Sequence, residues 1–305
     1  MSLILENALL SASDGLVQAR KKIWFHFQKY PWDLGCPENN PGPGVHRRRI
    51  EARILRGLPE PKNTRKLSGT YHLGISPHIY SYYHLFADLL PHLIVSPQYP
   101  VLVPEFLPKS FIKLLNEVGF QTLILPPENF QVEQLIVPEI TTPDWNLKKI
   151  NTIQSFFEKI FPLKSPPDIP SSKSAKRIYI SRKLAVKRHL ANEVEFLPLL
   201  KKNDFQKEYL ERMRIQQQVE LFREASHIVA AHGAGLTNIL FAPTKVKILE
   251  IRPLLSSGQF CFENLFSQKW NESELLVPPR KGKFILPLDS LSEVLERWGL
   301  DNHTN

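Results

Sequence analysis

Two features that are scarce in this sequence limit what the protein can be. The 305-residue chain has only two cysteines, Cys36 and Cys261, which are too few and too far apart for a disulfide framework or a cysteine metal site. Long apolar runs are also missing: the run at residues 228–231 is typical, whereas a membrane span needs about 20 apolar residues. The first ten residues carry Glu6 and no basic lead, so no secretory signal is predicted. We therefore expect the protein in a reducing cytoplasm.

Recognisable metal motifs are absent as well. The chain contains no Asp-x-Asp pair, which many enzymes use to hold a divalent cation. Four histidines lie close in the sequence, but their spacings of 6, 6 and 8 match no standard zinc pattern; they are His72, His78, His84 and His92. We expect neither a metal nor another cofactor.

The formal net charge of +9 favours an anionic partner. The basic residues are spread out, except at residues 47–49 and 173–188, and no aromatic-and-basic RNA-binding signature appears. The charge pattern therefore predicts no nucleic-acid partner. A phosphate-bearing substrate fits better, as does peripheral contact with the inner membrane, where a membrane-held acceptor would lie.

The order of the expected elements predicts two α/β domains. A hairpin at residues 3–20 is followed by alternating strands and helices. Residues 162–176 contain four prolines among serines and lysines, which is typical of a linker. We therefore expect an N-terminal α/β domain at residues 1–165 and a Rossmann-like domain at residues 166–305, where strands and helices alternate in the rhythm of a nucleotide-binding half.

The most informative motif lies in the second domain. An apolar strand, residues 228–231, leads directly into two glycines and a helix start. Glycines let the backbone approach a ligand, and the free N–H groups of a helix start favour phosphate. The expected phosphate contacts in this segment are His232, Gly233, Ala234, Gly235, Thr237 and Asn238. The alternative is a plain strand-to-helix turn in which His232 is satisfied within the protein.

Three segments in this order resemble the pattern of the family 61 glycosyltransferases. The first runs from Tyr179 to Glu193 and includes Arg182 and Arg188, the second is residues 218–238, and the third is residues 249–251. A weaker match lies at residues 82–91. The resemblance implies a GT-B-like fold, in which two Rossmann-type α/β domains face each other across a cleft. It also implies inverting transfer from a nucleotide sugar, with the N-terminal domain on the acceptor side.

Within this resemblance, charged residues that follow strands are candidates for donor binding. Arg182 and Arg188 are expected to bind the diphosphate, because the guanidinium fork suits phosphate; a surface salt bridge is the alternative. Glu250 ends a buried strand and is expected to bind the ribose, or else to pair with Arg252. Asn192 and Glu193 are interpreted as a helix cap and a favourable first-turn charge.

His84 and Asp88 are the candidate catalytic pair. They are four residues apart and therefore share one helix face. Asp88 would orient the imidazole of His84, which would take the proton from an acceptor hydroxyl, although which of the two is the base stays open. The alternative is an ordinary amphipathic helix. Leu85 and His92 stand where many relatives carry Trp and Arg, a departure that concerns the acceptor more than the chemistry.

The prediction is an inverting, metal-independent transfer of a sugar from a nucleotide diphosphate, first of all UDP, to a glycan or a lipid-linked sugar. A non-catalytic binding protein with a degenerate transferase fold is the main alternative. A dinucleotide-dependent enzyme is a second alternative, but residues 232–238 supply only the first two glycines of its G-x-G-x-x-G turn.

Overall fold

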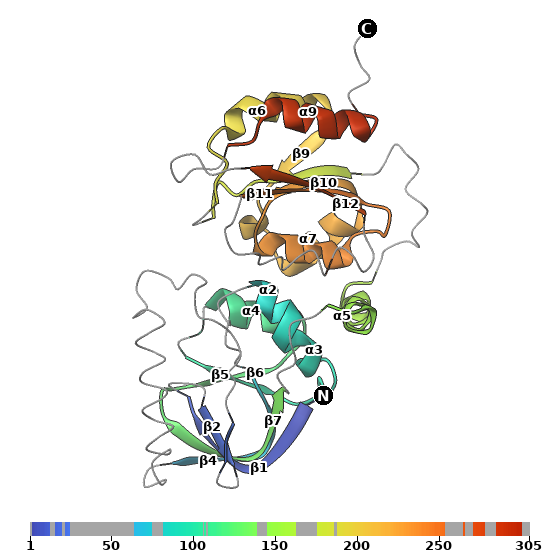
Figure 1. The fold of residues 1–305 in the computed structure, drawn as a ribbon. Coiled ribbons are helices and arrows are strands. Elements are labelled where there is room, and N and C mark those ends of the chain that lie inside the picture. The colour runs from blue at the N-terminus through green and yellow to red at the C-terminus, as the bar shows by residue number, and fades with distance from the viewer. Residues whose placement is uncertain are drawn as a thin grey trace. The chain divides into compact units, whose positions relative to one another are not determined.

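The computed structural model describes residues 2–12, 16–19, 22–24, 64–74, 82–105, 107, 109–138, 145–162, 176–185, 188–253, 265, 271–277 and 285–300. The chain divides into two compact units, Met1–Pro143 and Asp144–Asn305 (Figure 1). Each unit has helices packed on a sheet that contains parallel strands, which confirms the predicted α/β fold class.

The first unit is built on a seven-stranded mixed sheet in the order β3-β2-β1-β7-β4-β5-β6. Its strands are β1 (Ser2–Ser11), β2 (Leu16–Ala19), β3 (Lys22–Trp24), β4 (Arg65–Leu73), β5 (Val101–Pro104), β6 (Thr122–Leu125) and β7 (Asn129–Pro138). Strands β7, β4, β5 and β6 run parallel, whereas β1 pairs antiparallel with both β2 and β7. The predicted N-terminal hairpin is thus confirmed, and it extends the sheet beyond a plain Rossmann half.

A helix interrupted by a π-helical segment follows β4. It comprises α2 (Tyr82–His84), the π-helix η1 (Leu85–Leu89) and α3 (Leu90–Leu93), and the later helix α4 (Lys109–Glu117) connects β5 to β6. The sequence pattern predicts a helix at residues 82–90 that Ser81 caps and that ends near Pro91. The helix instead continues through Pro91, which lies in the first turn of α3, and the Leu90 N–H donates to the Leu85 carbonyl in the wider π-helical turn. Ser81 lies outside the described residues.

The second unit has a fully parallel sheet in the order β9-β8-β10-β11-β12. The strands are β8 (Lys176–Ile180), β9 (Phe205–Glu208), β10 (Ala225–Ala231), β11 (Lys247–Pro253) and β12 (Asn271–Val277). Numbered along the chain, this is the doubly wound order 2-1-3-4-5. Strand β12 did not appear in the sequence-based prediction; the other four did.

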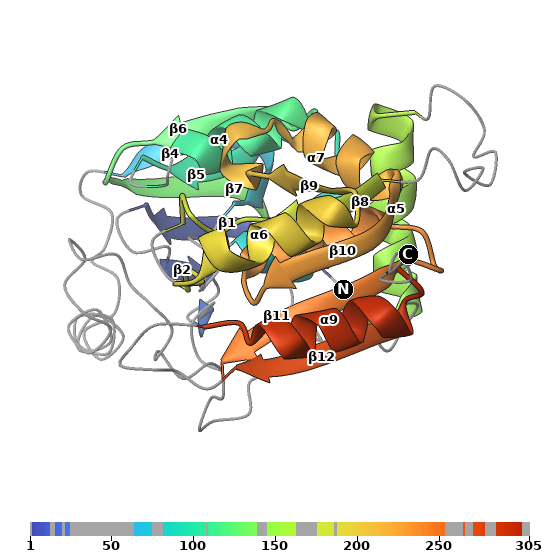
Figure 2. The same cartoon turned by 90° about the horizontal axis from the view of Figure 1, so that it is seen from above.

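Helices cover both faces of this sheet. In Figures 1 and 2, α6 (Glu193–Lys202) and α9 (Leu288–Arg297) lie on one face, and Figure 1 shows α7 (Ile215–Arg223) on the other. Alternate strand residues supply the core beneath α6 and α9, including Tyr179, Val229 and Leu249. The intervening residues of each strand therefore point toward the α7 face.

Helix α5 (Leu147–Ile160) belongs to the second unit, although residues up to 165 were assigned to the N-terminal domain from the sequence. Its Phe157 is fully buried, with its ring 4.8 Å from that of Phe241 in the 3₁₀ helix η3 (Ala234–Phe241). The Gln154 amide also donates to the Leu240 carbonyl. The unit therefore begins before α5, because that helix buries its apolar face against η3.

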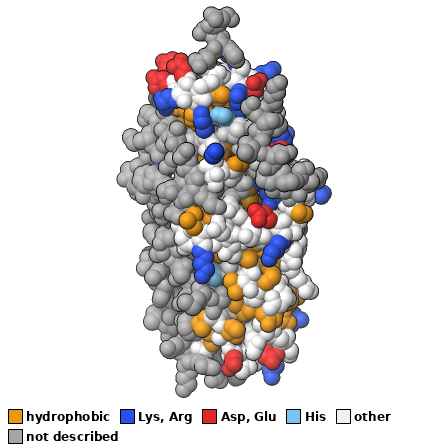
Figure 3. Space-filling view, turned by 90° about the vertical axis from the view of Figure 1, so that its right-hand side faces the viewer, with side chains coloured by type: hydrophobic (Ala, Val, Ile, Leu, Met, Phe, Trp, Pro, Cys, Tyr) orange, Lys and Arg blue, Asp and Glu red, His pale blue; other side chains and the backbone are white. Residues whose placement is uncertain are grey.

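Neither a membrane-spanning helix nor, on the face drawn in Figure 3, a continuous band of basic side chains is found among the described residues. No helix in the described part of the chain is long and apolar enough to cross a membrane. On the face drawn in Figure 3, the described lysine and arginine side chains are scattered, and some lie beside aspartate or glutamate side chains.

Candidate functional site

The polar residues of the second unit gather at the reversal point of its sheet. The chain leaves β8 toward β9 on one side and leaves β10 toward β11 on the other. Open α/β sheets bind ligands in the crevice beyond the carboxyl ends of two such strands. Arg182 follows the end of β8, and His232 follows the end of β10. Strand order thus brings together two residues that are 50 positions apart in the sequence.

The glycine turn after β10 is shaped by Arg182. The backbone N–H of His232 donates to the Ile251 carbonyl at 2.8 Å, which continues the β10–β11 pairing by one residue. Gly233 has extended backbone, so no unusual φ requires glycine there. Glycine is needed for space instead, because a Cβ at this position would lie 2.0 Å from Arg182 Nη1. The Arg182 guanidinium therefore lies directly over the turn.

Arg188 brings a second guanidinium to the same turn. Its Nη1 donates to the His232 carbonyl at 3.4 Å. The backbone of Arg188 has a φ of 64°, a conformation that residues other than glycine rarely adopt and that is often found at functional positions. Burial and the nearby charge of Arg188 both lower the pKa of Arg182, while Glu211 acts in the opposite direction. Two cations are therefore held close together in a partly buried place.

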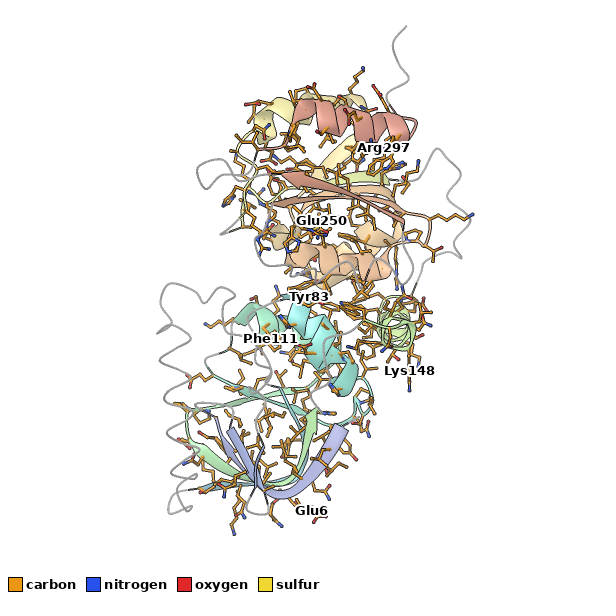
Figure 4. The ribbon with its side chains drawn as sticks, in the orientation of Figure 1. Glu6, Tyr83, Phe111, Lys148, Glu250 and Arg297 are labelled. Carbon is orange, nitrogen blue, oxygen red and sulfur yellow. The ribbon has the colours of Figure 1, made fainter. Side chains whose placement is uncertain are left out.

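A buried chain of three hydrogen-bonded polar groups lies behind the turn. His232 Nδ1 hydrogen-bonds to Glu250 Oε1, and Arg252 Nη2 donates to Glu250 Oε2 at 2.8 Å. Glu250 lies on the α7 side of the sheet (Figure 4), and its side chain is 1% exposed. Burial opposes ionisation, but the hydrogen bonds and charges of His232 and Arg252 hold the pKa of Glu250 below its ordinary value. The pairing with Arg252, which was the alternative to ribose binding, is thus present.

The residues after the glycines are interior. Thr237 and Asn238 in η3 are both fully buried. Asn238 Nδ2 donates to Gln218 Oε1 at 2.8 Å, and the Gln218 amide donates to the Leu210 carbonyl at 3.1 Å. The Thr237 hydroxyl, in contrast, has no hydrogen-bond partner among the described residues. Asn238 therefore fixes η3 against α7 in this state, and the donor contacts expected of both residues stay predictions.

Ala234 and Gly235 form the first turn of η3. This helix has 3₁₀ geometry over its eight residues, where the sequence predicted a helix from Gly235 onward. A Cβ at Gly235 would lie 2.9 Å from Leu210 Cδ1. The second glycine therefore allows close packing against η2 (Leu210–Arg212), the 3₁₀ turn that follows β9.

The loop that carries Arg182 rests on a polar network that sequence reasoning missed. The Ser181 hydroxyl donates to Glu193 Oε1 at 2.5 Å, and Lys207 Nζ lies 2.9 Å from the same oxygen. Although burial raises the pKa of Glu193, these hydrogen bonds and the charge of Lys207 bring it below its ordinary value. Glu193 thus ties the end of β8 to the start of α6 and to β9, beyond the first-turn charge expected for it.

The expected capping role of Asn192 is wrong. Asn192 occupies the N-cap position of α6, but its side chain makes no capping hydrogen bond. It binds Leu286 instead: Asn192 Nδ2 donates to the Leu286 carbonyl at 2.7 Å, and the Leu286 N–H donates to Asn192 Oδ1 at 2.9 Å. The segment before α9 satisfies both ends of the amide, an outcome that no local signal at position 192 reveals.

The predicted catalytic pair lies in the first unit. His84 ends α2, Asp88 lies in the π-helix, and His84 Nδ1 is 2.7 Å from Asp88 Oδ2. Both side chains are partly exposed, at 15% and 18%. Short π-helical segments are frequent at functional sites. The sequence spacing thus predicted a real contact, and the pair can accept and relay a proton.

Comparison with protein families and curated proteins adds independent findings. The family profile described as Glycosyltransferase 61 matches residues 82–249, more than half of the chain. The match begins at α2 and ends within β11, so it includes His84, Asp88 and the glycine turn. Among the described residues, no group of three or more His, Cys, Asp or Glu side chains is placed to hold a metal ion.

Two individual proteins are similar to parts of this chain. The EGF domain-specific O-linked N-acetylglucosamine transferase of Drosophila melanogaster is 28% identical over 138 residues, which are 42% of this chain. The aligned part is 26% of that protein, so the chain spans about a quarter of its length. A solved structure, the bacterial iron-containing dodecameric glycosyltransferase TibC from enterotoxigenic E. coli, aligns over 77% of each chain with 12% identity and a TM-score of 0.35.

Proposed function

Because the chain belongs to glycosyltransferase family 61, we propose that it transfers a sugar from a nucleotide diphosphate sugar to an acceptor hydroxyl. The proposed donor site is the turn at the reversal point of the second sheet, with Arg182, Arg188 and His232 as the diphosphate contacts. The observation that carries the proposal is that both guanidinium groups lie at one turn, with Arg182 over Gly233 and Arg188 Nη1 donating to the His232 carbonyl. Burial, and then repulsion by Arg188, lower the pKa of Arg182. A bound diphosphate would relieve that repulsion with its two negative charges.

The proposed reaction is a direct displacement with inversion. The acceptor oxygen forms a bond to the anomeric carbon while the bond from that carbon to the diphosphate oxygen breaks. His84 takes the proton from the acceptor hydroxyl, and Asp88, which is hydrogen-bonded to His84 Nδ1, stabilises the imidazolium that forms. Arg182, Arg188 and His232 stabilise the negative charge that grows on the leaving nucleoside diphosphate.

Arg182 and Arg188 supply fixed positive charge at the leaving group and His232 adds a third contact, and for that reason we propose a metal-independent reaction. Such an enzyme keeps its turnover rate when EDTA is added to the assay. A large loss of rate with EDTA that Mg²⁺ or Mn²⁺ restores would show that a cation takes part.

The donor and acceptor are proposed at the level of chemical class. The name of the Drosophila relative makes N-acetylglucosamine the first sugar to test, although only a quarter of that protein aligns with this chain. Because UDP is the nucleotide expected first, the first donor to test is UDP-N-acetylglucosamine. The acceptor is proposed to be a glycan or a lipid-linked sugar, which the basic chain would meet at the inner membrane face. A lipid diphosphate would suit the net charge of +9.

Thermal unfolding with a panel of uridine, guanosine and cytidine sugars tests the donor site. A nucleotide sugar at 100 times its dissociation constant adds about 2.7 kcal/mol to the free energy of unfolding, a shift that is easily measured. R182A should lose this shift, whereas K183A, which removes an exposed positive charge at the next position, should keep it. If no nucleotide sugar shifts the melting temperature, the donor site proposed here is wrong.

A turnover assay separates the enzyme from a binding protein of the same fold. The wild-type protein, given the donor that binds, should release nucleoside diphosphate faster when a glycan acceptor is present. Binding of a donor without transfer or hydrolysis, across a broad set of acceptors, would favour the non-catalytic alternative.

A further inference from the structure

We propose that Glu250, held by Arg252, orients His232 so that His232 meets the donor diphosphate as an imidazolium. This inference rests on the proposed function and reassigns Glu250 from a ribose contact to a positioning residue. His232 remains the group that touches the donor.

Both carboxylate oxygens of Glu250 hold a hydrogen-bond partner within the protein. One oxygen binds His232 Nδ1, and the other accepts a hydrogen bond from Arg252 Nη2 at 2.8 Å. The side chains of Glu250 and Arg252 are only 1% and 2% exposed. Each oxygen could accept a second hydrogen bond, but the carboxylate is so buried that a ribose hydroxyl could reach it only after the groups that cover it move.

Glu250 fixes the position of the hydrogen on the His232 ring. An ionised carboxylate can only accept a hydrogen bond, so His232 must carry its hydrogen on Nδ1 where it meets Glu250. Arg252 keeps Glu250 ionised, in agreement with the lowered pKa of that carboxyl group. Glu250 therefore selects the tautomer and the direction of the ring, as carboxylates commonly do for functional histidines.

A phosphate oxygen of the donor requires a hydrogen-bond donor at His232 Nε2. A neutral His232 with its hydrogen on Nδ1 presents a lone pair at Nε2, and a phosphate oxygen is an acceptor too. The two repel unless Nε2 takes up a proton. Binding of a nucleotide sugar should thus take up a proton from solvent onto Nε2 wherever the free enzyme has a neutral ring, and affinity should fall as pH rises.

Other charged groups near His232 also influence donor affinity. Arg188 donates to the His232 carbonyl, Arg182 lies over Gly233, and Glu211 partly offsets the charge of Arg182. The arginines stay charged between pH 6 and 8.5, so they attract the donor equally over that range. A pH-dependent affinity in this window would therefore report on His232.

The test is E250Q, which keeps the shape of the side chain. Arg252 needs an acceptor, so the carboxamide oxygen will face Arg252 and its NH₂ group will face His232 Nδ1. The ring then moves its hydrogen to Nε2, as replacement of an orienting carboxylate by a carboxamide is known to do. Nitrogen-15 NMR of labelled histidine, with the His232 signals assigned by H232Q, should show Nδ1–H in the wild type and Nε2–H in E250Q.

Affinity measurements give the second readout. The probe is UDP-N-acetylglucosamine, or the panel member that binds best, because the diphosphate of a nucleotide sugar does not titrate between pH 6 and 8.5. The wild-type dissociation constant should rise up to tenfold per pH unit in the upper part of this range, whereas that of E250Q should stay nearly constant. E211Q, a carboxylate change near Arg182 that leaves His232 untouched, should keep the wild-type slope.

The outcomes separate this inference from the proposed function. A wild-type His232 with its hydrogen on Nε2, or equal pH slopes in wild type and E250Q, would overturn the orienting role of Glu250. If E250Q does not fold, the tautomer of the wild-type protein still decides the question. If no nucleotide sugar binds, the proposed function fails, and the NMR result alone tells whether Glu250 orients His232.

Discussion

The guanidinium group of Arg182 occupies the space that a side chain at position 233 would fill. A Cβ on Gly233 would lie 2.0 Å from Arg182 Nη1 and 2.7 Å from Cζ. Gly233 is therefore required by the site, and its extended backbone would accept any residue type. This relationship links two segments of the family pattern through direct contact.

G233A should displace Arg182 without unfolding the protein, because the group in conflict is the mobile end of a long side chain. We expect donor affinity to fall about tenfold to a hundredfold, in the range of one charge-assisted hydrogen bond, with little change in melting temperature. Calorimetric titration with the best-binding nucleotide sugar measures the effect. In the R182A background G233A should cost nothing further, and additive losses would mean that the glycine acts on the donor by another route.

T237V should stabilise the protein and weaken donor binding. The Thr237 hydroxyl is buried without a partner among the described residues, so its removal should add about 1 kcal/mol to the free energy of unfolding. A donor contact would explain why an unpartnered hydroxyl is present at position 237. If the Thr237 hydroxyl binds the donor diphosphate, donor affinity should fall about threefold or more in T237V. T237S, which keeps the hydroxyl, is the matched control. Unchanged affinity in T237V would remove Thr237 from the donor site.

H84N should lower kcat by about 10²-fold to 10⁴-fold, the usual contribution of a general base, and leave the dissociation constant of the donor unchanged. D88N should lower kcat less, since it removes the partner of His84 Nδ1 and not the base itself. Steady-state kinetics with the identified acceptor measure both. H189N, the same change at an exposed histidine, is the control, and full activity in H84N would refute the assignment of the base.

Stability should decline as the pH falls from about 6.5 to 4, in part because of His227. Burial, and then the charges of Arg177 and Lys247, lower the pKa of His227 to about 4 in the folded protein. Below the ordinary value of 6.5 the unfolded chain binds a proton that the folded state rejects, so lower pH favours unfolding. Above 6.5 both states are neutral and the effect vanishes.

The variant H227F tests this linkage, because His227 already lies beside the rings of Phe205 and Trp298. Between pH 7 and 4.5 its melting temperature should fall less than that of the wild type. H189N, a change at an exposed histidine, should follow the wild-type curve. Parallel curves for wild type and H227F would show that another group controls the acid sensitivity.

Local signals were sufficient for much of the fold. The apolar strand before His232, the two glycines and the periodic helices predicted most elements of the second unit, and the four-residue spacing predicted the contact of His84 with Asp88. The family match over residues 82–249 confirms the resemblance that the motifs indicated. These features follow from neighbours in the chain, where backbone geometry alone determines which residues meet.

Contacts between distant segments were not predictable in the same way. Asn192 binds Leu286 instead of capping its own helix. Glu250 pairs with Arg252, which the sequence offered as its alternative partner, but it also binds His232, which no pattern near position 250 indicated. A buried polar group is satisfied by whichever segment packs against it, and short stretches of sequence do not specify that segment.

The sequence by itself determined which residues are candidates for phosphate binding, since arginines, a histidine and glycines that follow strands are suited to phosphate wherever such strands lie. Only the tertiary structure decided that these residues lie together. The parallel order of the second sheet makes β8 and β10 neighbours and leaves their carboxyl ends at one edge. That order depends on how the crossover helices pack over the whole sheet, which no short stretch of sequence specifies.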